Sequence, residues 1–195
     1  SVESVGEYAM SGTTVMSPIY VRDIGGNAFA GCDFYDPETK SSTLVLSSFI
    51  RKIGADAFNG TRAKKVVFPK YCTAELGTDL FGDFFLSGFA PAVTEVVLPD
   101  NMTRIPDFMF IGCNELEKVH WPSGQFEVGD YAFYGCSKPS LESLPRTLRK
   151  VGSYSFVNCW NPEQDRVLKL PDGLKEIGPY AFTYTYNYVR TELVE

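Results

Sequence analysis

The sequence predicts a solenoid of the α/β class, built from short coils that stack along one axis. Three observations support this prediction: a recurring hexamer, a proline that closes a short apolar run in most units, and length variation confined to one part of the unit. Self-similarity with a period of about 20 to 50 residues is the signature of stacked-repeat architectures. We expect short parallel strands on one face and irregular or short helical segments on the other.

The hexamer has the pattern Ile-Gly-x-x-Ala-Phe, and its copies set the length of the unit. Four copies keep the pattern closely and four are degenerate, and they begin at Val5, Ile24, Ile53, Leu76, Ile105, Val128, Val151 and Ile177. The intervals between them range from 19 to 29 residues, and 23 is the most frequent. We expect the large Ile and Phe side chains to fill the coil interior, while Gly and Ala let neighbouring coils approach.

The short apolar run before each proline is the predicted strand. In the segment 116–122, Val119 and Trp121 alternate with Lys118 and His120, which is the period of a half-buried strand. Proline ends the strand because it has no N–H to donate to the ladder. The next hexamer usually begins six residues after the proline, so the constant part of the unit runs from the proline to the hexamer phenylalanine.

Length changes fall between that phenylalanine and the next proline, and we expect them as projecting loops at 34–40, 83–91 and 160–164. Glu142 stands where an apolar residue is expected, which predicts a local bulge or register shift. One coil cannot bury its own apolar face, so we treat residues 1–195 as a single domain of about eight coils.

The alternating tyrosines after the last hexamer indicate that residues 183–195 form a C-terminal cap. An incomplete cap would leave an open end, and end-to-end homodimerisation would follow.

Charge and hydropathy exclude several functions. A net charge of -6 and a pI of about 4.9 argue against binding to nucleic acid or an anionic membrane, because both need clustered Lys and Arg. The chain has no run of 18 apolar residues, so we predict no membrane span. Residues 1–8 lack the features of a signal peptide, and we expect any export signal or lipid anchor to lie outside this chain.

Four of the five cysteines occupy equivalent positions, three residues after the hexamer phenylalanine: Cys32, Cys113, Cys136 and Cys159. Stacking would place successive thiols about 4.8 Å apart with parallel Cβ vectors, which does not suit a disulfide. We interpret them as small buried thiols, since metal-ligand spacings such as C-x-x-C are absent. Cys72 lies outside this column and is the expected exposed thiol. No metal or cofactor is predicted.

Catalysis would have to be built on His120, the single histidine. Strand alternation places His120 outward on the sheet face, beside Lys118. The hexamer glycine stands alone, without a phosphate-loop pattern around it. We therefore predict that the chain is not an enzyme and has no catalytic residue.

The outward positions of the predicted strands, with one aromatic residue from a loop, form the candidate binding face. The candidate residues are Val45, Lys65, Val67, Glu95, Val97, Lys118, His120, Lys169 and Trp160. The apolar strip from Val45 to Val97 has two interpretations: a partner-binding patch, or the ordinary preference of strands for β-branched residues.

The hexamer, the Gly-Cys pair after it and the apolar run before proline together resemble the BspA-like leucine-rich repeats over residues 5–182. This resemblance implies a right-handed leucine-rich-repeat solenoid with its parallel sheet on the concave face, and an extracellular or cell-surface location. We expect a module for adhesion or protein–protein interaction that binds protein or glycan through the concave sheet and the insertion loops. The alternative is a structural spacer of a larger surface protein, with no ligand of its own.

Overall fold

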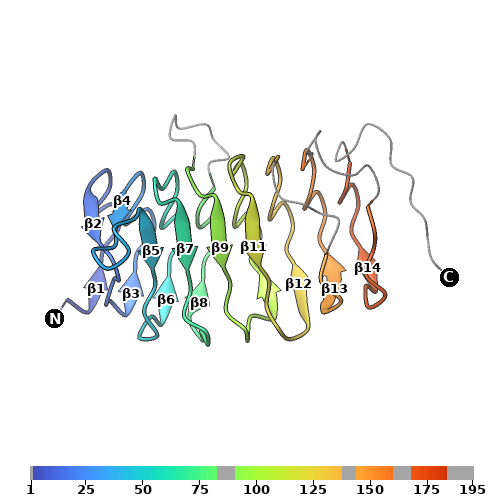
Figure 1. The fold of residues 1–195 in the computed structure, drawn as a ribbon, viewed down its shortest axis with the longest axis horizontal. Coiled ribbons are helices and arrows are strands. Elements are labelled where there is room, and N and C mark those ends of the chain that lie inside the picture. Colours follow the sequence, from blue (N-terminus) through green and yellow to red (C-terminus); the bar gives the residue numbers. More distant parts are fainter. Residues whose placement is uncertain (1, 83–90, 138–143, 160–167, 184–195) are drawn as a thin grey trace.

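A computed structural model describes residues 2–82, 91–137, 144–159 and 168–183 of the chain. Within these ranges the chain forms a parallel-strand solenoid of about seven turns, whose coils follow one another from the N-terminal to the C-terminal end (Figure 1). The described residues contain fourteen short strands and no helix. The repeat and the strands are therefore confirmed, whereas the expected helical segments are not.

The runs that precede the prolines form a four-stranded parallel sheet, which we call the front sheet. Its strands are β5 (Thr43–Val45), β7 (Lys65–Val67), β9 (Glu95–Val97) and β11 (Lys118–His120). They pair in the order β11-β9-β7-β5, so each strand lies beside its counterpart in the next coil. This arrangement confirms the strand positions predicted from the sequence.

The N-terminal end carries a separate parallel pair, β2 (Thr14–Met16) and β4 (Asp33–Tyr35). The expected loop at 34–40 is therefore wrong at its beginning, because Phe34 lies in a strand and is fully buried. Its ring packs against Phe29 and Phe58, with centroids 5.8 and 6.0 Å away. Burial of an aromatic ring outweighs the tendency of inserted residues to project into solvent.

A second row of strands, which we call the rear row, begins each hexamer on the side where irregular or helical segments were expected. One sheet contains β1 (Ser4–Val5), β3 (Asp23–Ile24), β6 (Lys52–Ile53) and β8 (Glu75–Leu76). The other contains β10 (Arg104–Ile105), β12 (Phe126–Val128), β13 (Leu148–Val151) and β14 (Glu176–Ile177).

The hexamer glycine holds neighbouring coils of the rear row together. The amide of Gly54 donates a hydrogen bond to the Ile24 carbonyl at 2.7 Å, and that of Gly77 to the Ile53 carbonyl at 2.8 Å. A Cβ on Gly54 or Gly77 would lie 2.6 or 2.5 Å from a backbone nitrogen of the preceding coil. Only glycine allows the coils to approach this closely.

The fourth residue of every hexamer has a left-handed backbone, which explains the missing helix. Its φ lies between 53 and 60°, and the residues are Tyr8, Asn27, Asp56, Asp79, Phe108, Tyr131, Tyr154 and Tyr180. A left-handed residue turns the chain out of a right-handed helical path, so no helix continues through the hexamer.

The hexamer phenylalanines form a continuous stack through the core, as the sequence predicts. The stack comprises Phe29, Phe58, Phe81, Phe110, Phe133, Phe156 and Phe182, with successive ring centroids 5.2 to 5.6 Å apart. All but Phe182 are buried. Since each interior ring packs on the rings of both neighbouring coils, no interior coil is stabilised on its own.

The bulge expected near Glu142 falls outside the described residues, as do the loop expected at 160–164 and the cap beyond residue 183. The loop expected at 83–91 also lies outside them, except for Pro91. A register shift is present in the following strand, between the pairs Phe126–Leu148 and Glu127–Lys150. Arg149 is thus the extra residue of β13, and its guanidinium donates to the Arg146 carbonyl at 2.6 Å.

Candidate functional site

The front sheet presents two rows of side chains on its outer face, and seven of the nine predicted site residues lie in them. The apolar row consists of Val45, Val67 and Val97 and ends at His120. The charged row consists of Lys65, Glu95 and Lys118 and begins at Thr43, which is buried. Between the two rows lie Leu44, Val66 and Val96, which are fully buried and point into the core. The alternation of the strands thus positions the outer rows, and the buried middle row fixes the register.

Glu95 is the centre of the charged row. Its Oε1 accepts a hydrogen bond from Lys65 Nζ at 3.1 Å and lies 2.8 Å from Nε2 of His120. The hydrogen bond from Lys65 is the main cause that lowers the pKa of Glu95; desolvation opposes it, and His120 adds to the lowering. The carboxylate is therefore ionised at neutral pH and links three neighbouring coils.

This arrangement is suited to charge recognition. Glu95 interacts with two nitrogen donors, from Lys65 and His120, and its side chain is 26% exposed. Lys65 and His120 are each 41% exposed at the side chain, so both can turn toward a partner. Among the described residues, no group of three or more His, Cys, Asp or Glu is placed to hold a metal ion.

The two remaining predicted residues are not part of this surface. Lys169 is exposed but lies in no described strand, and Trp160 lies outside the described residues. Met16 is exposed on the separate β2-β4 pair, at 60%. The continuous outer face therefore extends from β5 to β11.

The four cysteines of the column are buried and free, in agreement with the prediction. The Cys136 and Cys159 thiols donate to the Phe110 and Phe133 carbonyls of the preceding coils, at 3.1 and 2.9 Å. Burial raises the pKa of Cys113, Cys136 and Cys159, so these thiols stay protonated and unreactive. Cys72 is half-buried, so it is more accessible than the column but not fully exposed.

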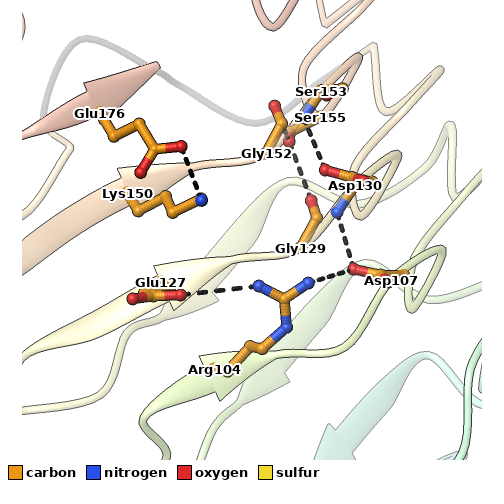
Figure 2. A network of polar contacts seen from close by, with 10 residues as sticks. All are labelled: Arg104, Asp107, Glu127, Gly129, Asp130, Lys150, Gly152, Ser153, Ser155 and Glu176. Carbon is orange, nitrogen blue, oxygen red and sulfur yellow. Dashed lines mark hydrogen bonds and ion pairs between the residues drawn. The ribbon is translucent and has the colours of Figure 1, made fainter. Parts of the chain in front are cut away.

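A charge ladder on the rear row was missed by the sequence analysis. The outward residues alternate in sign along paired strands: Asp23, Lys52 and Glu75, then Arg104, Glu127, Lys150 and Glu176. Figure 2 shows the second group, in which Lys150 Nζ lies 2.6 Å from Glu176 and Arg104 lies 3.6 Å from Glu127. Hydrogen bonding to Glu176 raises the pKa of Lys150. The alternation could have been found by aligning the residues before each hexamer.

The same network extends into the hexamer turns. The Asp107 carboxylate accepts from Arg104 at 2.6 Å and from the Asp130 amide at 2.8 Å (Figure 2). Asp130 in turn accepts from the Ser153 amide at 2.7 Å. These acids satisfy backbone donors of the next coil, so their role in this network is structural.

A second missed feature is an aromatic ladder at hexamer position four. Phe108, Tyr131, Tyr154 and Tyr180 stack with centroids 4.9 to 5.0 Å apart. Loss of solvation raises the pKa of Tyr154, and Tyr131 and Tyr180 raise it further. The aromatic type recurs in four successive hexamers, so a comparison of this position across the copies predicts the ladder.

The sequence profile of the BspA type leucine-rich repeat region matches the chain in two segments, residues 1–86 and 82–193, with 6 copies of the repeat. No curated protein sequence matches it. The described residues contain no helix that is long and apolar enough to span a membrane.

Two solved structures are similar in fold. The pneumococcal vaccine antigen PcpA superposes with a TM-score of 0.59 over 97% of this chain, at 20% sequence identity. The leucine-rich repeat protein of T. pallidum superposes with a TM-score of 0.54 over 95% of this chain, at 24% identity. The chain spans 63% of the pneumococcal protein and 72% of the treponemal one. Bacterial leucine-rich-repeat proteins thus share this architecture.

Proposed function

The chain belongs to the BspA-type leucine-rich repeat family, and from this premise we propose that it is a protein-binding module, secreted or displayed at the cell surface. Leucine-rich-repeat solenoids are typically non-catalytic scaffolds, and we propose that this chain likewise binds without catalysing a reaction. That a solved structure of the same fold is a pneumococcal vaccine antigen is consistent with this location.

The observation that best supports the proposal is the outer face of the front sheet. Its apolar row holds half-buried valines at Val45, Val67 and Val97, directly beside the charged row centred on Glu95. Binding surfaces commonly combine an apolar centre with polar and charged groups at the rim. The fold does not need these outward side chains, because the inward row already supplies the core.

The charged row favours a protein partner. Lys65, Lys118 and His120 surround a single carboxylate, which leaves donors available for acidic side chains of a partner. Charge complementarity of this kind sets specificity and association rate more than affinity. We propose that the front sheet mediates adhesion to a matrix protein. A glycan ligand would be detected by the binding assay described next.

The experiment is a binding assay on immobilised extracellular-matrix proteins and glycans, using surface plasmon resonance. The test variant carries Val67→Ser, Val97→Ser and His120→Ser, and its circular dichroism is compared with that of the unmodified chain. The matched control carries Lys52→Ser, Glu127→Ser and Lys150→Ser on the rear row. We expect the front variant to lose about tenfold or more in affinity and the control to bind as before.

Two outcomes would contradict the proposal. If the folded front variant binds as tightly as the unmodified chain, the outer face is not the binding surface. If nothing on the array binds, the chain acts as a spacer within a larger protein. The end-to-end homodimer remains a prediction, and sedimentation velocity over a range of concentrations tests it directly.

A further inference from the structure

The rear row is interrupted between β8 and β10. These strands end two separate sheets, and no Cα of β8 lies within 8 Å of a Cα of β10. Paired strands lie about 4.8 Å apart, so β8 and β10 are too far from each other to pair. Figure 1 shows the wide interval along the rear row, where all other neighbouring strands lie side by side.

Pro106 accounts for the hydrogen bond that is missing at this gap. It stands at hexamer position two, where Gly54 and Gly77 donate to the preceding coil. Proline has no N–H to donate to the Leu76 carbonyl, and its ring occupies the space that glycine leaves free for close approach. A ladder that depends on glycine at this position therefore cannot close between Leu76 and Ile105.

The two coils are hydrogen-bonded to each other on either side of the gap, so their separation is local to β8 and β10. On one side the Asp79 amide donates to the Asp107 carbonyl at 3.2 Å, which joins the hexamer turns. On the other side the Asn101 side chain makes two hydrogen bonds of 2.9 Å with the backbone of Cys72. The front sheet also continues across the gap, since β7 pairs with β9.

An open pocket of about 410 Å³ occupies this interval, and its lining is part polar and part apolar. It is lined from both coils, with Ala74 and Leu76 on one side and Arg104 and Pro106 on the other, and Met102 also contributes. Leu76 is only half-buried, whereas Ile53 and Ile105, its counterparts in the flanking coils, are 1% and 0% exposed. The gap thus exposes an aliphatic side chain that every interior coil otherwise covers.

The backbone edges of the gap match the requirements of one additional strand. In the intact ladder, the Arg22 and Ile24 carbonyls accept from the Lys52 and Gly54 amides of the next coil. At the gap, the corresponding carbonyls of Ala74 and Leu76 accept no hydrogen bond from the described part of the chain. Open strand edges of this kind recruit extended peptides by strand addition.

The side chains around the gap restrict what the added strand can be. Its outward residue would lie between Glu75 and Arg104, which are opposite in charge, so a neutral hydrogen-bonding side chain fits best. Its next residue would face Leu76 and Met102, which favours an aliphatic side chain. The residue after that would meet the Pro106 ring, which leaves room only for glycine.

We propose that the gap between β8 and β10 binds one extended segment of a partner protein as an added parallel strand, with the pattern neutral polar, aliphatic, glycine. This site lies in the rear row, whose sheets are separate from the front sheet, and it goes beyond the proposed function. It can fail or succeed independently of that surface, because the front variant leaves the gap unchanged.

The probe is a fluorescein-labelled peptide based on residues 48–55 of this chain, with Lys52→Gln, blocked at its C-terminus as an amide. It carries the sequence Ser-Phe-Ile-Arg-Gln-Ile-Gly-Ala, so the glutamine, isoleucine and glycine meet the pattern. The matched control is N-methylated at the glutamine and glycine nitrogens, which removes the donors for the Ala74 and Leu76 carbonyls. Fluorescence polarisation with the full chain is expected to give saturable binding, about tenfold or more weaker for the control.

Substitutions in the chain at the gap provide the second test of peptide binding. Pro106→Gly restores the missing donor, so we expect the ladder to close and the peptide to bind about tenfold more weakly. Pro179→Gly is the control, because this exposed proline lies outside the gap. Ala74→Phe fills the cavity by a different route and is expected to give the same loss if Pro106→Gly does not fold. The proposal would be overturned if the unmethylated peptide does not bind, or if the N-methylated peptide binds equally well. It would also be overturned if the folded gap variants bind the peptide as tightly as the unmodified chain.

Discussion

The imidazole Nε2 of His120 lies 2.8 Å from Oε1 of Glu95, and the same oxygen lies 3.1 Å from Nζ of Lys65. These partners are 25 and 30 residues from Glu95 in the sequence, yet they occupy adjacent strands of the front sheet. Stacking of the coils therefore creates a charge cluster from isolated residues, and this cluster can be tested by titration.

The Glu95 cluster makes stability depend on pH in the acidic range. The pKa of Glu95 is lower in the folded chain than its ordinary value, so the unfolded chain holds the proton more tightly. Its stabilising contribution is complete above the unfolded pKa of about 4.3 and is lost as pH falls through the folded pKa. We expect Glu95→Gln to lower the free energy of unfolding at pH 7 by about 1 kcal/mol or less.

Thermal unfolding of both forms between neutral and acidic pH measures this contribution. The difference in Tm between the unmodified chain and Glu95→Gln should shrink as the pH falls below the unfolded pKa of about 4.3. Glu38→Gln, at an exposed turn, is the control and should follow the unmodified chain. A Tm difference that stays constant with pH would contradict the assignment.

The phenylalanine stack should contribute strongly to the free energy of unfolding of the solenoid. Phe133 is fully buried and stacks on Phe110 and Phe156, at 5.2 and 5.3 Å. Phe133→Ala should reduce the free energy of unfolding by about 3 to 5 kcal/mol, because it removes contacts with two coils and leaves a cavity. Phe49→Ala is the matched control, since Phe49 is 64% exposed and should cost about 0.5 kcal/mol or less. Equal costs in chemical denaturation would contradict this account.

The cysteines should differ sharply in reactivity. In the folded chain, only Cys72 is expected to react readily with a thiol reagent such as dithiobis-nitrobenzoate, because the other four are buried. Cys72→Ser should therefore remove the fast phase of the reaction, and denaturant should release the remaining thiols. A fast phase that persists in Cys72→Ser would show that the cysteine column is accessible.

The aromatic ladder should stabilise the C-terminal coils. Tyr154→Asn keeps a residue type that tolerates a left-handed backbone, as Asn27 does at the equivalent position. The substitution therefore reports mainly the loss of stacking on Tyr131 and Tyr180, and we expect it to cost about 1 kcal/mol. Asp56→Asn, outside the ladder, should leave the denaturation midpoint nearly unchanged. A Tyr154→Asn midpoint equal to that of the unmodified chain would refute the stacking contribution.

The repeat allowed the central features to be predicted from sequence. The hexamer places Phe133 in the core, and strand alternation places Val97 and His120 on one outer row, as observed. These predictions succeed because burial periodicity is repeated in every coil and each copy reinforces the others.

The remaining features depend on single residues or on very short elements. Strands such as β6 and β8 have two residues, which is too short for alternation to appear in the sequence. The left-handed residue at hexamer position four excludes a helix, yet it shows no common residue type across all copies. Pro106 was recognisable as a departure from the hexamer, but its effect on the ladder appears only when the coils are stacked.

If partners bind the outer face of the front sheet, labels placed at single sites will detect the contact. In a Cys72→Ser background, one variant carries Val97→Cys on the front sheet and another carries Lys52→Cys on the rear row, each with an environment-sensitive fluorophore. On addition of a matrix protein that binds the chain, the emission of the Val97→Cys label should shift and that of the Lys52→Cys label should not. A shift confined to the Lys52→Cys label would contradict binding at the front sheet.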